Sequence, residues 1–261
     1  MRYRTLNLSF GPNRLSNTPN HAPAGSELSP SALRFIESVL ELRPRVAVFD
    51  CDGTLWEGDS GADFFYWQIG RGMVPDEIGL WAIARYDDYK AGNVDEETMC
   101  GEMVTINAGV RESLLEEASG EFFSSVVQDR IFPEMLELTR RLAAIDCSLW
   151  AVSSTNVWTV RAGVKQFGIP PDHVLGACVH IQEGCATGQL IRVPSGPAKA
   201  TAIREVVQQP VDVCFGNSIH DAAMLEIAGK AFAVNPNPDL EARAKDRGWK
   251  IYWPAGTAGT N

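Results

Sequence analysis

Short apolar runs recur along the chain and predict buried strands. The first, Val46–Phe49, is β-branched and aromatic, and Asp, Gly and Thr follow it. Similar runs cover residues 148–152, 211–215 and 231–234, and each ends at a polar or Gly-containing turn. Short continuous runs of this kind are typical of strands that are covered on both faces. Helical patterns lie between them, so the alternation predicts an α/β fold with a parallel sheet.

The stretch from residue 58 to residue 130 interrupts this alternation. It contains no convincing strand and indicates several helices instead. Its aromatic residues include Phe64, Phe65, Tyr66, Trp67, Trp81, Tyr86 and Tyr89. We expect an inserted helical subdomain, with most of these aromatic side chains in its own core.

The remaining residues divide into a core and an arm. Residues 28–57 and 131–261 form the expected α/β core. We expect it to begin with a helix Pro30–Leu40, because Ser29 suits the N-cap and Pro30 suits the first turn. Residues 1–27 are rich in Pro, Asn, Ser and Gly, which predicts a loosely ordered N-terminal arm.

The composition narrows the class of protein. The chain has 261 residues, of which 45% are hydrophobic, enough to bury a sizeable core in one large or two smaller domains. Its net charge is −10 and it has no cluster of Lys and Arg, so nucleic acid and anionic membranes are poor candidate partners. An anionic substrate would therefore need local positive charge, from a metal ion, a basic residue or a helix N-terminus.

The six cysteines include no C-x-x-C pair, so their spacing gives no support to a zinc site. Reduced thiols in a cytoplasmic protein are the simplest interpretation. No apolar run approaches the roughly 18 residues of a membrane span, and the N-terminus lacks the apolar segment of a signal peptide. We expect a cytoplasmic protein, and the sequence makes no prediction of its oligomeric state.

Candidate chemistry begins directly after the first strand, in Asp50-Cys51-Asp52-Gly53-Thr54. Two carboxylates two residues apart can both face the crevice at the carboxyl edge of the sheet, where open α/β sheets bind ligands. A calcium loop counted from Asp50 would need Gly at position six and Glu at position twelve, where this chain has Leu55 and Gly61. Solvated turn chemistry is the remaining alternative.

Polar residues also follow the later strands. Ser153 ends the second run, where its hydroxyl can bind a phosphoryl oxygen or cap the next helix. Lys199 lies at a predicted helix start, although a lone Lys is usually a solvated surface residue. Asn217 and Asp221, in Gly-Asn-Ser-Ile-His-Asp, place an amide and a carboxylate after the third run, and His220 beside them suits a structural or substrate-facing role.

Taken in order, these elements resemble the four motifs of the haloacid dehalogenase superfamily. They are DCDGT, a strand-terminal Ser, a Lys and G-N-S-x-x-D, and the resemblance covers roughly residues 45–253. The helical insert after the first motif looks like the small cap of the phosphoserine phosphatase-like branch. The resemblance implies a Rossmann-like parallel sheet flanked by helices, with an inserted α-helical cap.

The same resemblance implies a mechanism. Asp50 would be the nucleophile that forms an aspartyl-phosphate, and Asp52 would be the general acid and then base. Ser153 and Lys199 would hold phosphoryl oxygens. Mg²⁺ would be bound by Asp50, the carbonyl of Asp52 and the fourth motif, Asn217 and Asp221. The expected activity is Mg²⁺-dependent hydrolysis of a small phosphorylated metabolite.

The chain departs from the family pattern at Asn217, where an acidic residue is usual. An amide oxygen can bind Mg²⁺ but brings no charge, so we expect weaker metal binding. Asp221 would then be the main acidic group of the motif, as a ligand or through a bound water.

Substrate recognition is less specified. Asp59 stands where the family has a Glu that binds the substrate's ammonium, and it could equally be the N-cap of the first cap helix. The family's carboxylate-binding Arg has no clear counterpart, and Arg85 or Lys90 could substitute for it. Phosphoserine, another amine-bearing ester such as phosphoethanolamine or phosphocholine, and a sugar or polyol phosphate all stay open.

Two other functions fit the same residues. A phosphotransferase or mutase of this fold would pass the phosphoryl group to an alcohol instead of water. A non-catalytic binding protein is suggested by Asn217 alone, and the presence of Asp50, Asp52, Ser153 and Lys199 argues against it.

Overall fold

The computed structural model describes residues 28–257, so the expected N-terminal arm lies outside the described residues. The strands are β1 (Val46–Phe49), β2 (Ser148–Asn156), β3 (Val174–Gln182), β4 (Cys185–Arg192), β5 (Val213–Gly216), β6 (Lys230–Val234) and β7 (Lys250–Tyr252). They form one seven-stranded sheet in the order β4-β3-β2-β1-β5-β6-β7, parallel throughout except for the antiparallel β3–β4 pair. The expected α/β fold with a parallel sheet is confirmed.

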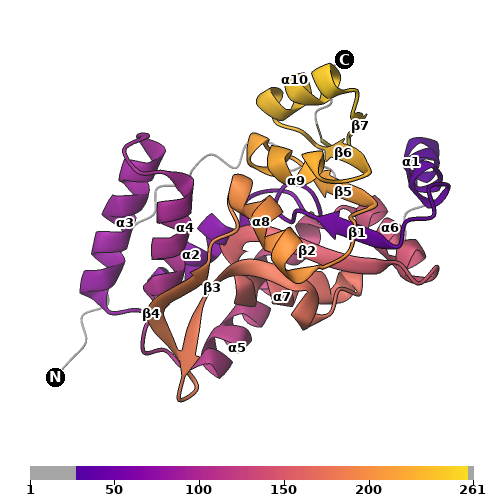
Figure 1. Ribbon diagram of the computed structural model, residues 1–261. Helices are drawn as coiled ribbons and strands as arrows, with labels where there is room; N and C mark the ends of the chain where they lie inside the picture. The colour runs from indigo at the N-terminus through magenta and orange to yellow at the C-terminus, as the bar shows by residue number, and fades with distance from the viewer. Residues whose placement is uncertain (1–27, 258–261) are drawn as a thin grey trace.

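Helices flank the sheet and build a separate group at one end (Figure 1). The helices are α1 (Pro30–Leu40), α2 (Ser60–Gly70), α3 (Asp76–Lys90), α4 (Glu96–Thr105), α5 (Glu112–Phe122), α6 (Pro133–Ala143), α7 (Val157–Val164), α8 (Pro197–Val206), α9 (Ala222–Glu226) and α10 (Pro238–Arg247). Short helical segments are the π-helix η1 (Phe123–Val127) and the 3-10 helices η2 (Gln128–Arg130), η3 (Lys165–Phe167), η4 (Pro171–His173) and η5 (Ile219–Asp221). Residues 58–130, which hold the elements from α2 to η2, are called the cap. Every helix or strand assigned within this segment is a helix, and short turns join them, as the sequence predicted.

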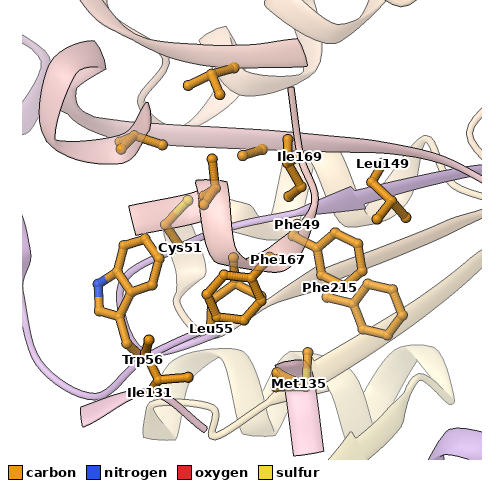
Figure 2. Packing of buried hydrophobic residues seen from close by; sticks show 14 of the residues in the cluster. Phe49, Cys51, Leu55, Trp56, Ile131, Met135, Leu149, Phe167, Ile169 and Phe215 are labelled. Carbon is orange, nitrogen blue, oxygen red and sulfur yellow. The ribbon is translucent and has the colours of Figure 1, made fainter. Parts of the chain in front are cut away.

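The central strand β1 is covered on both faces because all four of its residues are apolar. Ala47 and Phe49 point into one core, and Val46 and Val48 into the other. In the first core the rings of Phe49 and Phe215 stack with centroids 4.5 Å apart (Figure 2). This continuous burial is what fixes the carboxyl end of β1, and hence Asp50, in the middle of the sheet.

The cap has its own apolar core, built around Phe65, Val74, Ala82, Tyr86, Met99 and Ile106. Phe64 and Phe122 pack instead into the core of the sheet. Trp81 is exposed, so this aromatic residue does not contribute to the core of the cap.

The second expected strand extends beyond its predicted end. β2 runs to Asn156, and its register with β3 shifts between Val152 and Asn156. A bulge of this kind breaks the ladder locally and re-aims side chains. It lies at the carboxyl edge of the sheet, where Ser153 and Thr155 face the cavity described next.

Candidate active site

A cavity of about 270 Å³ lies between the carboxyl ends of the strands and the cap. From the core it is lined by Asp50, Asp52, Ser153, Lys199 and Asn217. From the cap it is lined by Asp59 and by residues of α2, α3 and α4. The structure thus brings five of the expected catalytic, phosphate-binding and metal-binding residues, and Asp59, to a single cavity.

Gly53 allows the first and fourth motifs to meet. Its φ is +74°, in the left-handed region that L side chains rarely adopt. A Cβ added there would lie 1.9 Å from the side-chain nitrogen of Asn217. The Asn217 side chain therefore packs directly on the turn that carries the two carboxylates.

Asp50 is held by two donors at the end of β1. Lys199 Nζ donates to its Oδ1 over 2.7 Å, and Thr54 Oγ1 donates to its Oδ2 over 2.8 Å. Burial, and after it repulsion from Asp221, raises the pKa of Asp50, while Lys199 opposes the rise. A further positive charge next to Asp50 would favour its ionised, nucleophilic form.

Lys199 joins two carboxylates in the interior. Its Nζ lies 2.7 Å from Asp50 Oδ1 and 2.6 Å from Asp221 Oδ1, and the residue is 3% exposed. Burial lowers the pKa of Lys199, the two carboxylates raise it, and the net shift is upward. Lys199 is therefore a charged, fixed side chain and not a solvated surface lysine.

Both carboxylate oxygens of Asp221 accept hydrogen bonds from other groups of the protein. Its Oδ1 accepts from Lys199, and its Oδ2 accepts from the backbone N–H groups of Asn217 and Ser218, both over 2.9 Å. It is fully buried and does not line the cavity. These contacts favour a role in holding Lys199 and the Asn217 loop over the expected role as a metal ligand.

Asp52 is oriented by three donors. Trp56 Nε1 and the backbone N–H of Ser60 donate to its Oδ1, and Thr155 Oγ1 donates to its Oδ2, each over 2.7 Å. Ser153, 2% exposed, accepts from the backbone N–H of Thr155 over 3.1 Å. Thr155 was not among the site residues expected from the sequence, and Asn156 is the residue that caps α7.

Asp59 serves as the N-cap of α2, with its side chain accepting from the N–H of Ala62 over 2.9 Å. It also lines the cavity, so the two interpretations of this residue are compatible. Burial, and after it repulsion from Asp52, raises the pKa of Asp59 to about 6.

Arg85 does not line the cavity. Its Nε and Nη2 donate to Glu102 on α4, over distances of 2.9 and 2.8 Å. This ion pair joins α3 to α4 within the cap. Lys90 is also absent from the cavity lining, with its Nζ over the ring of Tyr86 at 5.6 Å.

A contact that no sequence motif indicated joins the cap to the core at the edge of the cavity. Glu96, at the start of α4, lies with its Oε2 2.8 Å from Nδ1 of His220 in η5. This hydrogen bond is the main cause of the raised pKa of His220. The two residues are far apart in sequence, and no motif spacing pairs them.

The chemistry of the available ligand atoms shows whether the cavity suits Mg²⁺. Among residues 28–257, no group of three or more His, Cys, Asp and Glu side chains is arranged to hold a metal ion. Asp50, Asp52 and Asn217 nevertheless share one cavity, and a carboxylate, a backbone carbonyl and an amide all offer hard oxygen atoms. This mixed oxygen set fits Mg²⁺, which keeps part of its water shell.

Comparison with known proteins identifies the family. The haloacid dehalogenase-like hydrolase family matches residues 47–226. The chain belongs to this family, which confirms the family and the class of enzyme, a phosphatase, that the sequence predicted.

Individual relatives carry phosphatase names. The chain is 25% identical over 229 residues to a Mycobacterium tuberculosis protein named phosphoserine phosphatase, covering 78% of this chain and 69% of the relative. It is 25% identical over 217 residues to a Neisseria meningitidis histidinol-phosphatase, covering 79% of this chain and 97% of the relative.

Solved structures support the fold. A protein of unknown function from Bordetella pertussis matches with a TM-score of 0.69 at 22% identity, over 80% of this chain and 97% of that one. A probable phosphoserine phosphatase from Vibrio cholerae matches with a TM-score of 0.60 at 19% identity, over 90% of this chain and 71% of that one.

Proposed function

We propose that the protein is a Mg²⁺-dependent phosphomonoesterase that works through an aspartyl-phosphate on Asp50. The observation that carries this proposal is the cavity that Asp50 and Asp52 share, with Lys199 bonded to Asp50. A nucleophile, a proton carrier and a fixed cation together are what phosphoryl transfer to a carboxylate requires.

In the proposed reaction an oxygen of Asp50 attacks phosphorus. The bond from phosphorus to the leaving alkoxide breaks as Asp52 transfers its proton to that oxygen. Asp52 then takes a proton from water, which attacks the aspartyl-phosphate and releases inorganic phosphate and Asp50. The hydroxyl of Ser153 and the ammonium of Lys199 would hold phosphoryl oxygens throughout.

Asp50, the carbonyl of Asp52 and the amide of Asn217 would hold Mg²⁺. The ion supplies positive charge against the repulsion between Asp50 and the phosphate. Asp221 would act indirectly, by holding Lys199 and the loop of Asn217 in place.

The cap side of the cavity favours an amine-bearing substrate without a carboxylate. Asp59 and Glu96 are acidic, and Lys199 is the only Lys or Arg among the cavity-lining residues within 28–257. The carboxylate of phosphoserine would meet no arginine here, whereas histidinol phosphate, the substrate class in one relative's name, has an ammonium and no carboxylate. Residues 58–130 would act as the substrate-reading cap, and the six free thiols suit the cytoplasm.

Phosphate release from a panel of small phosphomonoesters with Mg²⁺ tests this function. The panel holds phosphoserine, phosphoethanolamine, phosphocholine, histidinol phosphate and several sugar phosphates. We expect release by the wild type, none by Asp50→Asn, and an acid-stable mass increase of one phosphoryl group on the Asp50 peptide of quenched enzyme. Labelling without release unless an alcohol is added would establish a phosphotransferase instead, and neither labelling nor release would favour a binding protein.

A further inference from the structure

Gln68 is a buried polar residue that the mechanism above does not use. It lies in the third turn of α2, is 1% exposed and lines the same cavity. Its Oε1 has no hydrogen-bond partner among the atoms of residues 28–257. Because burying an unpaired carbonyl is unfavourable, an atom of this kind at a cavity wall points to a ligand that pairs with it.

The surroundings of Gln68 offer no such partner. Phe65 precedes it by one helical turn and belongs to the same apolar cluster as Tyr86 and Met99, against which Met103 packs, and all four line the cavity. Apart from the amide this wall is aromatic and apolar, so it suits a flat ring. The group that completes it must bring a hydrogen-bond donor to Gln68 Oε1.

The position of Gln68 sets the length of the ligand. Asp59 is the N-cap of α2, and Gln68 follows nine residues later, roughly 13 Å along the helix axis. Helical side chains lean back toward the N-terminus, which brings the amide about one turn closer to Asp59. A two-carbon amine whose ammonium pairs with Asp59 therefore has no further group with which to reach Gln68.

We propose that Gln68 is a specificity-determining residue that accepts a hydrogen bond from a ring N–H at the far end of the substrate. The leaving group would then carry two nitrogen groups, an ammonium near Asp59 and an N–H-bearing heterocycle beside Gln68, against the apolar side chains of Met99 and Met103. This inference rests on the proposed phosphomonoesterase activity and adds to it the class of alcohol that is released.

Two probes that differ only in the ring test this. Histidinol phosphate and phenylalaninol phosphate share the phosphate and the ammonium, and only the first has a ring N–H. For the wild type, kcat/KM should be about 10- to 100-fold higher for histidinol phosphate, as expected for one buried hydrogen bond. Gln68→Met, similar in size but without the acceptor, should bring this ratio close to one.

Three controls separate this effect from general damage. Gln68→Glu keeps an acceptor and should preserve the preference. Gln128→Met changes an exposed glutamine that bonds Gln166, and it should leave both substrates unaffected. Phosphoethanolamine has no further group with which to reach Gln68, so its hydrolysis should be equal in the wild type and Gln68→Met.

The outcomes distinguish this inference from the activity on which it rests. Hydrolysis of both probes with the same ratio in wild type and Gln68→Met would overturn the role of Gln68 and leave the phosphatase intact. If the wild type hydrolyses neither probe, calorimetric binding of the two to Asp50→Asn, with and without Gln68→Met, decides. An equal affinity for both probes would overturn the inference there as well.

Discussion

At the scale of single residues, the candidate proton carrier Asp52 is positioned by donors from three places in the chain. Thr155 reaches it from the bulged end of β2, Trp56 from the turn after β1 and Ser60 from the start of α2. Both carboxylate oxygens are thereby occupied and oriented. A general acid is effective only when its proton lies within hydrogen-bond reach of the leaving group.

Thr155→Val should therefore lower kcat with little change in KM. The substitution keeps the shape of the side chain and removes the donor to Asp52 Oδ2, so we expect a loss of roughly tenfold in kcat. Steady-state kinetics on the best substrate of the panel measures it. Thr201→Val, which removes an exposed hydroxyl on α8, serves as the control. A rise in KM with unchanged kcat would place Thr155 in substrate binding instead.

Asn217→Asp should strengthen the proposed metal site. A charge-bearing ligand would replace a neutral amide next to Asp50, so the Mg²⁺ concentration for half-maximal rate should fall by roughly tenfold. Without Mg²⁺, the new charge adds to a cluster of carboxylates and should lower the melting temperature. Thermal unfolding with and without EDTA, beside a Mg²⁺ titration of the rate, checks both effects. An unchanged or higher Mg²⁺ requirement would argue against Asn217 as a ligand.

The ionised side chain of Asp59 should lower the free energy of unfolding at neutral pH. Its pKa in the folded protein is raised to about 6, so the folded state binds the proton more tightly than the unfolded state. The stabilising effect of that proton is complete below about pH 4 and is lost as the pH rises through 6. Asp59→Asn keeps an N-cap and should gain about 1 kcal/mol at pH 7.5, a value that allows for solvent screening of this accessible side chain, and nothing at pH 4.

A second N-cap provides a control of opposite sign. The backbone and side chain of Thr98 hydrogen-bond to Asp95, the N-cap of α4, and lower its pKa. Asp95 therefore stabilises the protein above its unfolded pKa, and this contribution is lost as the pH falls. Asp95→Asn should lower the melting temperature at pH 7.5. Equal behaviour of the two variants would contradict the difference in their surroundings.

At the scale of elements, the contact of α4 with η5 joins the cap to the core. His220 is 48% exposed in its side chain, and Glu96 is 16% exposed, so the pair lies at the rim of the cavity. An ion pair at such a site adds little stability. It does fix the start of α4 beside the loop that carries Asn217.

Glu96→Gln should lower the pKa of His220 toward its ordinary value. The hydrogen bond from Glu96 is the main cause of the upward shift, and an amide cannot stabilise the imidazolium as a carboxylate does. Titration of the His220 ring protons by NMR measures the change, and Glu97→Gln on the same turn is the control. If the pKa of His220 were the same in both variants, the contact would not exist in solution.

The elements also show what a sequence pattern can and cannot predict. Buried runs such as Val46–Phe49 predicted strands well because every residue is covered on both faces. The β3–β4 pair was not predicted, since β3 mixes Gly, Ala and Cys with an exposed end and β4 is largely exposed at the sheet edge. The strand β7 was also missed, because three residues are too few to show a period.

At the scale of the whole molecule, motif order carried more information than any motif alone. Asp50 and Asn217 each follow a strand, Ser153 lies in the last part of β2 and Lys199 lies in the first turn of α8, and a parallel sheet gathers such positions at one edge. Contacts that depend on side-chain direction cannot be predicted from motif order. The pairs Glu96–His220 and Arg85–Glu102, and the unpaired amide of Gln68, follow from packing of the cap and not from spacing.

Lys199 ties this edge of the molecule together, because it links α8 to the end of β1 and to η5 through two buried carboxylates. Lys199→Met would leave Asp50 and Asp221 uncompensated in the interior. Removing one partner of a buried pair costs about 3–5 kcal/mol, and we expect a loss of that size in the free energy of unfolding at pH 8.

The dependence of this loss on pH identifies its cause. Without Lys199 the two carboxylates take up protons more readily, so the loss should be smaller at pH 5 than at pH 8. Denaturant unfolding of both proteins at the two pH values measures it, with Lys245→Met, which changes an exposed lysine on α10, as the control. An equal loss at both pH values would mean that the lysine acts through packing of its side chain, and the charge network would then not be what holds the sheet edge in place.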